Sequence, residues 1–491
     1  MFTIRKGSAA IVFSLGLLAV AVRFILIDQP FVDKWSWRQS DVAAIARNYS
    51  TSGYHFATPQ IDWAGNEPGY VGTEFPILPF AAALSYRLTG IHAWVGRVQA
   101  VLFFAFSIPF FFNLVRDAFD EEAAVWSLLF YGFAPLSTMA SRCFMPDMPS
   151  MALSIVGLDL FRRWLSSGRS FFFWISASVL ALALLIKLPT AVIGVPLAVM
   201  AFQRFGRSTF SQAGLWIFGG LVLLPSCAWY WHACRIAQTF YPYHFFGAGG
   251  VAIESLFWYW RIIRMTIGSS LTIPLALLAL VGAILSTRGG SGRIFWWWGA
   301  VMVLFVVVVG YGNRHPWYRL PFVPIAAAFA GAACASLWRI SSGRLLARAG
   351  VSTIVIAFLC FAFVKTEVLY DERARDLQLL GFALKKTTPP GAIVVVADIG
   401  DPTAFYYGER KGWHFLERNG IYNGHPSDSA AAIADLADLR KRGAGYLAFY
   451  SGTLWWPKYY PEFAEYLART AIIESDTPNY RIYRLTESLG R

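Results

Sequence analysis

The sequence predicts a polytopic α-helical membrane protein that carries a small α/β domain at its C-terminal end. Of its 491 residues, 56% are hydrophobic and only 14% are charged, and the mean hydropathy is +0.48. A soluble globular chain is about 45–50% apolar and about 25% charged. The aromatic content of 17% excludes a disordered chain, and five cysteines in this length exclude a disulfide scaffold.

Apolar stretches of about the length of a bilayer crossing recur along the first 365 residues. We expect about eleven transmembrane helices, or twelve to thirteen if shorter apolar segments also cross. Phe75–Leu88 is one such segment, and its two prolines and Arg87 favour a helix that lies in the interface. The eleven predicted spans lie near residues 9–27, 95–115, 123–141, 148–164, 171–186, 189–203, 214–233, 269–286, 294–311, 318–337 and 346–365.

The positive charge belongs to the apolar part of the chain. Residues 366–491 hold 15 basic and 16 acidic residues, which leaves 27 basic and 13 acidic residues in the first 365. A basic membrane domain is typical of loops that face anionic lipid or bind phosphate, and no basic soluble patch predicts nucleic-acid binding. The short loops on the N-terminal side have the higher density of Lys and Arg, so we place the N-terminus inside and the outer loops 28–94 and 234–268 outside.

The tail, residues 366–491, predicts the α/β domain, and eleven spans place it outside. Residues 392–400 and 446–451 are typical of buried strands, and 471–485 alternates around a turn at 477–479 as a hairpin does. Residues 428–442 predict a helix with a basic C-terminal end. Because the tail has no GxGxxG, Walker or CxxC motif, we interpret it as a cap or recognition module, with catalysis in domain 1–365.

The first outer loop supplies the candidate catalytic acids. Arg38 and Asp41 are three residues apart, so a helix would place them on one face, and Glu74 directly precedes the apolar stretch from Phe75. Charges at the edge of a membrane are costly and often functional. The alternative interpretation is structural: Arg38 and Asp41 form a plain ion pair, and Glu74 begins a helix.

Further polar residues lie at the predicted outer ends of other spans. We interpret Arg23, inside the first span, as reaching outward to the interface. Two acids and several cations on one membrane face suit removal of a proton near a departing phosphate, although each cation alone is equally compatible with snorkelling. His232 follows Trp229–Trp231 and can be an interfacial histidine, and His315 can be a loop histidine. The candidate residues at these ends are Arg142, Asp147, Lys187, Tyr230, His232, His315, Tyr318 and Arg319.

At four motifs the chain resembles the GT-C glycosyltransferases, in particular the bacterial glycosyltransferase family 39 and ArnT-like group, which is allied to the protein O-mannosyltransferases. These motifs are WRQSDVAAIARN (37–48), GYVGTEFPILPF (69–80), RCFMPD (142–147) and HPWYRLPFVP (315–324). The resemblance covers about residues 1–340. It implies a bacterial inner-membrane enzyme that uses a polyprenyl-phosphate-linked sugar, with its active site and tail on the periplasmic side. It places the catalytic base on Asp41, with Asp33 as the fallback, and the second acid on Glu74.

The resemblance and the residues together predict transfer of a sugar from the lipid phosphate to an acceptor hydroxyl, with inversion. Arg38, Arg142, Lys187, His315 and Arg319 would bind the donor phosphate. Asp147, Tyr318, Tyr230 and His232 would contact substrate. No cofactor is required, and a divalent metal is compatible with the carboxylates but not implied. The partners would be the donor, membrane lipid and a glycan, lipid or protein acceptor. The alternative is a transporter or flippase of lipid-linked sugars, which would favour polar groups at mid-membrane.

Overall fold

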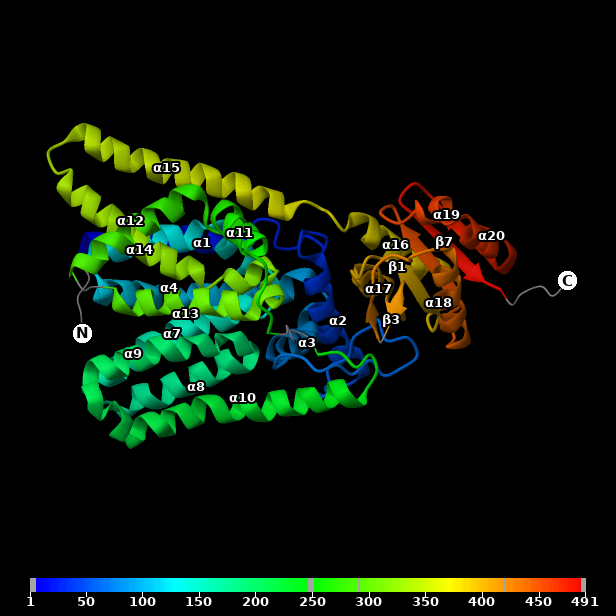
Figure 1. The fold of residues 1–491 in the computed structure, drawn as a ribbon, viewed down its shortest axis with the longest axis horizontal. Coiled ribbons are helices and arrows are strands. Elements are labelled where there is room, and N and C mark those ends of the chain that lie inside the picture. The colour runs from blue at the N-terminus through cyan, green and yellow to red at the C-terminus, as the bar shows by residue number, and fades with distance from the viewer. Residues whose placement is uncertain (1–5, 246–250, 290–291, 419, 487–491) are drawn as a thin grey trace. The chain divides into compact units, whose positions relative to one another are not determined.

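The computed structural model describes residues 6–245, 251–289, 292–418 and 420–486 (Figure 1). The chain is mostly helical and ends in a strand-containing domain, as the sequence predicts. By its contacts it divides into two compact units. Unit one consists of Met1–Ile27, Arg97–Trp229 and Gly247–Leu369, and unit two of Asp28–Gly96, Tyr230–Phe246 and Tyr370–Arg491. The first outer loop therefore groups with the tail.

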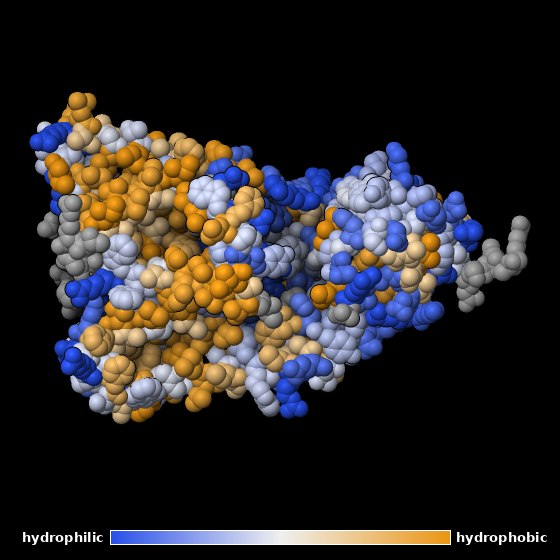
Figure 2. Space-filling view, in the orientation of Figure 1, coloured by the Kyte–Doolittle hydropathy of each residue, from blue (hydrophilic) through white to orange (hydrophobic). Residues whose placement is uncertain are grey.

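Unit one is a bundle of helices joined by short 3-10 or π segments. On the face seen in Figure 2, hydrophobic side chains cover these helices. Its elements, of which α4, α10 and η7 have some residues in unit two, are α1 (Lys6–Ala21), η1 (Val22–Phe24), α4 (Ala93–Ala118), α5 (Glu121–Phe133), α6 (Pro135–Ala140), α7 (Asp147–Ser167), α8 (Ser170–Ile186), η2 (Leu188–Ile193), α9 (Gly194–Phe205), η3 (Gly206–Ser211), α10 (Ala213–Thr239), α11 (Leu256–Met265), η4 (Thr266–Leu271), α12 (Ile273–Gly289), α13 (Arg293–Val309), η5 (Gly310–Asn313), η6 (Pro316–Arg319), α14 (Phe322–Ile340), α15 (Leu345–Glu367) and η7 (Val368–Tyr370).

Among the described residues, six helices are long and apolar enough to cross a membrane, or seven if one bent pair counts as a single span. The chain is therefore a multi-pass membrane protein, and the predicted count of eleven stays a prediction. The bent pair joins Leu256–Leu271 to Ile273–Ser286 at 102°, and two shorter apolar helices, Ala9–Phe24 and Ser170–Ile186, match predicted spans. The six long helices are Ala93–Ala118, Leu188–Ser211, Ala213–Thr239, Arg293–Asn313, Pro316–Ile340 and Leu345–Thr387.

The predicted outer loop 234–268 is partly helical, because α10 continues to Thr239 and α11 begins at Leu256. Residues 246–250 of this loop lie outside the described residues.

Arg23 differs from the prediction that it reaches outward to the interface. Its side chain is fully buried in unit one and donates hydrogen bonds to Ser141 Oγ, to Ser137 Oγ at 3.2 Å and to the Ala19 carbonyl. The guanidinium also lies 3.4 Å from the centre of the Phe104 ring. The hydroxyls and the ring replace water around the charge, so Arg23 joins α1 to the segment of α6 instead of snorkelling.

Unit two contains α2 (Ser36–Ser52) and α3 (Ile77–Thr89) from the first outer loop. Helix α3 has 13 residues and a length of about 20 Å, which is too short for a bilayer of about 30 Å. This length fits the predicted interfacial helix at Phe75–Leu88.

The tail folds as one five-stranded sheet in the order β2-β1-β5-β7-β6, with a separate two-stranded ribbon. Strand β1 pairs in parallel with β2 and β5, and the predicted hairpin is the antiparallel pair β6–β7. Figure 2 shows mostly hydrophilic side chains over this domain. Its elements are α16 (Arg375–Thr387), β1 (Ile393–Ala397), α17 (Thr403–Gly408), β2 (Lys411–His414), β3 (Glu417–Arg418), β4 (Ile421–Tyr422), α18 (Ser429–Lys441), β5 (Tyr446–Tyr450), α19 (Trp456–Tyr459), α20 (Pro461–Thr470), β6 (Ala471–Asp476) and β7 (Tyr480–Leu485).

Strand β1 has a core on each side because successive side chains alternate. On one side, Val394 and Val396 share a core with helix α16 and with Ile45, Tyr49 and other residues of the first outer loop. On the other side, Val395 and Ala397 pack with residues of α18 and α20. One apolar core therefore joins the first outer loop to the sheet.

Close helix packing in unit one generates a stability prediction at Gly282 of α12. A Cβ there would lie 1.8 Å from the carbonyl oxygen of Phe329 in α14, and a backbone atom cannot move aside cheaply. We expect Gly282→Val to lower the melting temperature in detergent and the yield of monodisperse protein, since overpacking typically costs about 1–3 kcal/mol. The matched control is Gly219→Val in α10, where nothing lies within 4 Å of the added Cβ. Equal stability of the two variants would contradict the close approach of α12 and α14.

Candidate functional site

The predicted site residues fall into two groups, one in each unit. In unit two, Asp41 lies on helix α2 and is 3% exposed. The indole Nε1 of Trp63 donates a hydrogen bond to its Oδ1 at 2.9 Å. Within the residues that the structure describes, this is the one hydrogen bond to the Asp41 carboxylate, so Oδ2 is left without a donor. A buried carboxylate with one oxygen held and the other unoccupied is suited to accept a proton.

The surroundings of Asp41 raise its pKa to about 7, chiefly because burial disfavours the charged form. The Trp63 hydrogen bond and the charges of Arg38 and His414 act in the opposite direction, and the charge of Asp401 raises the pKa again. A carboxyl group whose pKa is near neutral is a good general base at physiological pH.

The fallback residue, Asp33, has a structural position at the start of α2. Its Oδ1 accepts hydrogen bonds from the Trp35 backbone N–H at 2.9 Å and from the Gln39 side chain at 2.9 Å. Oδ2 accepts from the same Gln39 amide at 3.0 Å. Both oxygens of Asp33 are thus engaged in shaping the first turn of the helix.

Arg38 pairs with Glu74 and not with Asp41. Its Nη2 donates to Glu74 Oε1 at 2.9 Å and Oε2 at 2.8 Å, and both side chains are buried. The hydroxyl of Thr73 donates to Glu74 Oε2 at 3.1 Å. The alternative in which Arg38 and Asp41 form a plain ion pair is therefore wrong. The charge of Arg38 is partly neutralised by Glu74, which leaves Asp41 without an ion-pair partner of its own on α2.

Residues 230–246 bring two predicted substrate contacts and one unpredicted histidine into unit two. His232 Nε2 lies 2.8 Å from the Ala57 carbonyl oxygen, and the Tyr230 ring contacts the Phe245 ring at 6.1 Å. His244 lies against Trp63, with ring centres 6.0 Å apart. Burial and the charge of Arg38 lower the pKa of His244 to about 4, so its imidazole is neutral at pH 7.

The tail adds a buried cluster that the sequence did not reveal. Asp398 follows β1 and His414 ends β2, and parallel strands bring their carboxyl ends to the same edge of a sheet. His414 Nδ1 lies 2.8 Å from both oxygens of Asp398. Asp401 accepts a hydrogen bond from the hydroxyl of Ser36 at 2.6 Å, so the loop after β1 contacts the first turn of α2. The only sequence signal was the pair of acids in DIGD (398–401) after a buried strand.

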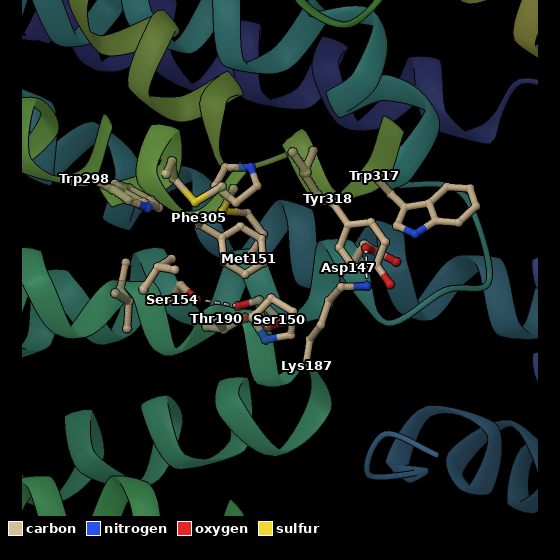
Figure 3. A pocket seen from close by; sticks show the side chains of 16 residues that line it. Asp147, Ser150, Met151, Ser154, Lys187, Thr190, Trp298, Phe305, Trp317 and Tyr318 are labelled. Carbon is tan, nitrogen blue, oxygen red and sulfur yellow. Dashed lines mark hydrogen bonds and ion pairs between the residues drawn. The ribbon is translucent and has the colours of Figure 1, made fainter. Parts of the chain in front are cut away.

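In unit one, Lys187, Asp147 and Tyr318 lie together at one end of a small cavity of about 40 Å³ (Figure 3). Lys187 Nζ lies 2.6 Å from Asp147 Oδ1 and 4.6 Å from the centre of the Tyr318 ring. Lys187 follows α8 in an extended conformation, since Pro189 prevents the helix from continuing. Most of the other lining residues are apolar, among them Met151, Ile193, Trp298, Met302 and Phe305.

Arg319 is a buried cation whose donors are mostly unused. It is 1% exposed, and its Nη1 donates to the Asn313 carbonyl at 2.9 Å. Its Nε and Nη2 make no hydrogen bond to any residue that the structure describes. A buried guanidinium with unused donors is costly unless an anion completes it.

The remaining two predicted cations have different surroundings. Arg142 is fully buried and its Nη2 donates to the Leu26 carbonyl at 2.5 Å. The ring of His315 stacks on Trp317, with centres 4.6 Å apart and planes within 6°. Over the described part of the chain, no group of three or more His, Cys, Asp or Glu residues has the geometry to hold one metal ion.

The raised pKa of Asp41 generates a prediction about stability and pH. A carboxyl group with a raised pKa binds more protons when folded, so its favourable contribution is complete below its unfolded pKa and is lost as the pH rises through about 7. We expect Asp41→Asn to melt a few degrees above the wild type at pH 8, with a difference that shrinks toward pH 5. The control is Asp62→Asn, which leaves buried Arg47 without its carboxylate and should lower the melting temperature throughout. A pH-independent effect of Asp41→Asn would contradict the raised pKa.

Comparisons with known proteins bear on the family and the fold. Residues 71–231 match the family model described as dolichyl-phosphate-mannose-protein mannosyltransferase. No curated protein matches the sequence. Among solved structures, the chain is similar to ArnT from Cupriavidus metallidurans in the apo state, with 14% identity, a TM-score of 0.68, and coverage of 97% of this chain and 98% of that chain.

Two further structures show the same likeness. ArnT bound to undecaprenyl phosphate matches with 14% identity and a TM-score of 0.67 over 96% of this chain and 97% of that chain. The oligosaccharyltransferase of Archaeoglobus fulgidus in the apo form matches with 13% identity and a TM-score of 0.61 over 98% of this chain and 74% of that chain. The resemblance predicted from the sequence is confirmed: the chain has the fold of the GT-C membrane glycosyltransferases over nearly its whole length.

Proposed function

We propose that the protein is a membrane glycosyltransferase that moves a sugar from a polyprenyl-phosphate donor to an acceptor hydroxyl. The observation that carries the proposal is the buried Asp41 carboxyl, which has one oxygen unoccupied and a pKa near 7, in a chain with a GT-C fold. The solved ArnT structure with undecaprenyl phosphate supports a lipid phosphate as the donor's leaving group. The site and the tail would face the periplasm of a bacterial inner membrane, as the density of basic loop residues indicates.

In the proposed reaction the acceptor oxygen attacks C1 of the sugar while the bond from C1 to the phosphate oxygen breaks. The hydroxyl proton passes to Asp41, and the lipid phosphate leaves with the bonding electrons. A single displacement inverts the anomeric centre. A positioned base of this kind contributes roughly 10²–10⁴ in rate. Every atom and charge balances with the side chains present, so the steps call for no cofactor.

Glu74 has a different role from Asp41. Because Arg38 binds both of its oxygens, Glu74 is held as a carboxylate in a fixed orientation. We assign the Arg38–Glu74 pair to orienting the acceptor or the donor phosphate and not to proton removal. Tyr230 and His232 belong to the same unit and would contact the substrate near its sugar.

In unit one, the leaving phosphate would be bound by cations. Asp147 partly neutralises the charge of Lys187, and the remaining positive charge lies beside an apolar cavity. A cation next to an apolar cavity is suited to a phosphate attached to a lipid. The unused donors of Arg319 are suited to phosphate oxygens, and Arg142 and His315 would assist.

The first experiment measures donor consumption by the purified full-length protein with a panel of polyprenyl-phosphate sugars. We expect Asp41→Asn to keep donor binding, seen as thermal stabilisation, and to lose about 10²–10⁴ in turnover. Glu74→Gln should instead weaken binding and turnover together. Full turnover by a folded Asp41→Asn would refute the assignment of the base. Transport of the intact donor across a vesicle membrane, without cleavage, would favour the flippase alternative.

The second experiment compares two buried arginines of unit one. Arg319→Met should lower turnover by about 10²–10³ with little change in melting temperature, since replacing a poorly partnered buried charge by an apolar side chain is often neutral. Arg23→Met removes a guanidinium that Ser137, Ser141 and Phe104 satisfy, and should lower stability instead. The exposed Arg314, which lies over Tyr311, provides a control that should change neither quantity. A large stability loss in Arg319→Met with normal turnover would show that Arg319 is structural.

A further inference from the structure

A histidine–aspartate pair is buried at the carboxyl ends of two parallel strands in the tail domain. His414 is 4% exposed and Asp398 is 1% exposed. The pair joins β2 to the loop after β1, and the Gly400 backbone N–H donates to Asp398 Oδ1 at 2.9 Å. The sheet core alone does not require such a pair, because an ionisable pair is costly to bury and apolar residues would fill the same space.

The pair lies beside the candidate base in unit two. Trp63 contacts both Asp41 and His414. Its Nε1 donates a hydrogen bond to Asp41, and the centre of its ring lies 5.0 Å from the centre of the His414 ring. Phe405 covers His414 from another direction, with ring centres 5.5 Å apart. His414 is therefore buried against aromatic rings, where water screens its charge poorly.

Several contacts fix the first outer loop against this end of the sheet. Gly412 of β2 exchanges backbone hydrogen bonds with the loop, from its N–H to the Asp62 carbonyl at 3.0 Å and from the Gly65 N–H to its own carbonyl at 2.7 Å. The hydroxyls of Ser40 and Thr403 lie 3.0 Å apart, one residue from Asp41. These contacts hold α2 in one position relative to His414.

The loop that carries Asp398 is also strained. Ile399 has φ +59°, a left-handed conformation that a β-branched side chain rarely adopts. Such a conformation costs of order 1–3 kcal/mol and is found mainly where a loop is held for a function. In this conformation a single short turn brings Asp398 to hydrogen-bonding distance of His414 and Asp401 to hydrogen-bonding distance of Ser36.

The charges around His414 favour its protonated form. Burial lowers the pKa of His414, but the carboxylates of Asp398, Asp41 and Asp401 outweigh this and raise it above the ordinary value. Arg38 of α2, which Glu74 binds, is the other cation near Asp41, and His244 is neutral. The titratable groups that interact with the pair are Asp41 from the first outer loop, Asp401 from the loop after β1, Tyr422 from β4 and Tyr450 from β5. Arg38 interacts with Asp41 and His244 contacts Trp63, so both lie on the side of the candidate base.

We propose that His414, held by Asp398, is a positioning residue that keeps the Asp41 carboxylate in its ionised, proton-accepting form. The proposal rests on the proposed function for its catalytic meaning. The imidazolium lies against the Trp63 ring whose Nε1 binds Asp41, and its positive charge offsets the cost of a carboxylate in a dry site. Asp398 fixes the ring through Nδ1 and supplies the negative charge that keeps the ring protonated. The tail domain thereby becomes part of the catalytic apparatus, although it was expected to be a cap or recognition module.

The test is the pH profile of turnover for His414→Gln and Asp398→Asn in the full-length protein. Both variants should lose about fivefold in turnover at pH 7 and recover most of that loss at pH 9, because a rise of about one unit in the pKa of Asp41 shifts the low-pH fall of the profile to higher pH. The double variant should match His414→Gln alone. The control is His425→Gln in the same domain, an exposed histidine that packs against Trp455. A loss that is equal at every pH would assign the pair a structural role only and overturn the proposal.

A second measurement is independent of turnover. The difference in melting temperature between Asp41→Asn and the protein with Asp41 should grow with pH and, when His414 is present, level off near pH 7. In the His414→Gln background it should level off at a higher pH. An unchanged profile would overturn the role of His414. If the wild type consumed no donor, the proposed function would fail, while this measurement would still decide whether His414 controls Asp41.

Discussion

The burial of helix α2 is the constraint on which unit two depends. The helix is rich in polar side chains, yet Arg38, Gln39, Ser40, Asp41 and Arg47 are all buried. Buried polar groups are stable only when they are bonded, so partners must come from elsewhere in the chain. They come from the second half of the outer loop, in Asp62 and Glu74, and from the tail, in Asp401 after β1 and Thr403 at the start of α17. The apolar core that the sheet shares with this loop follows from the same requirement.

The sequence predicted the features that depend on local pattern. The break at Lys187 between two apolar segments, the strands at 392–400 and 446–451 and the hairpin at 471–485 all appear where they were expected. The helix that the spacing of Arg38 and Asp41 assumed is present as α2. Each of these follows from a run of hydrophobicity or a turn residue within about twenty positions, which is the range over which such patterns are informative.

Contacts between distant segments could not be predicted in this way. The sequence suggested Arg38 with Asp41, three residues apart, whereas Arg38 binds Glu74, which is 36 residues away. His414 ends a strand of only four residues with no alternation, and its proximity to Asp398 depends on the parallel pairing of β1 and β2. The prediction that Arg23 reaches the interface was wrong for the same reason, because its hydroxyl partners lie more than 110 residues away in the sequence. Tertiary partners, and not local pattern, decide the state of each buried charge.

A base in a dry site meets two opposed requirements. Removing water makes Asp41 a stronger proton acceptor, but it also favours the protonated form that cannot accept a proton. A nearby positive charge resolves the conflict, but the two arginines of α2 already have carboxylate partners, Arg38 in Glu74 and Arg47 in Asp62. The second cation must then come from another segment, and His414 is placed to supply it without forming a salt bridge that would occupy the carboxylate. A histidine is better suited than an arginine here, because its charge can follow the protonation state of its carboxylate neighbours as the reaction proceeds.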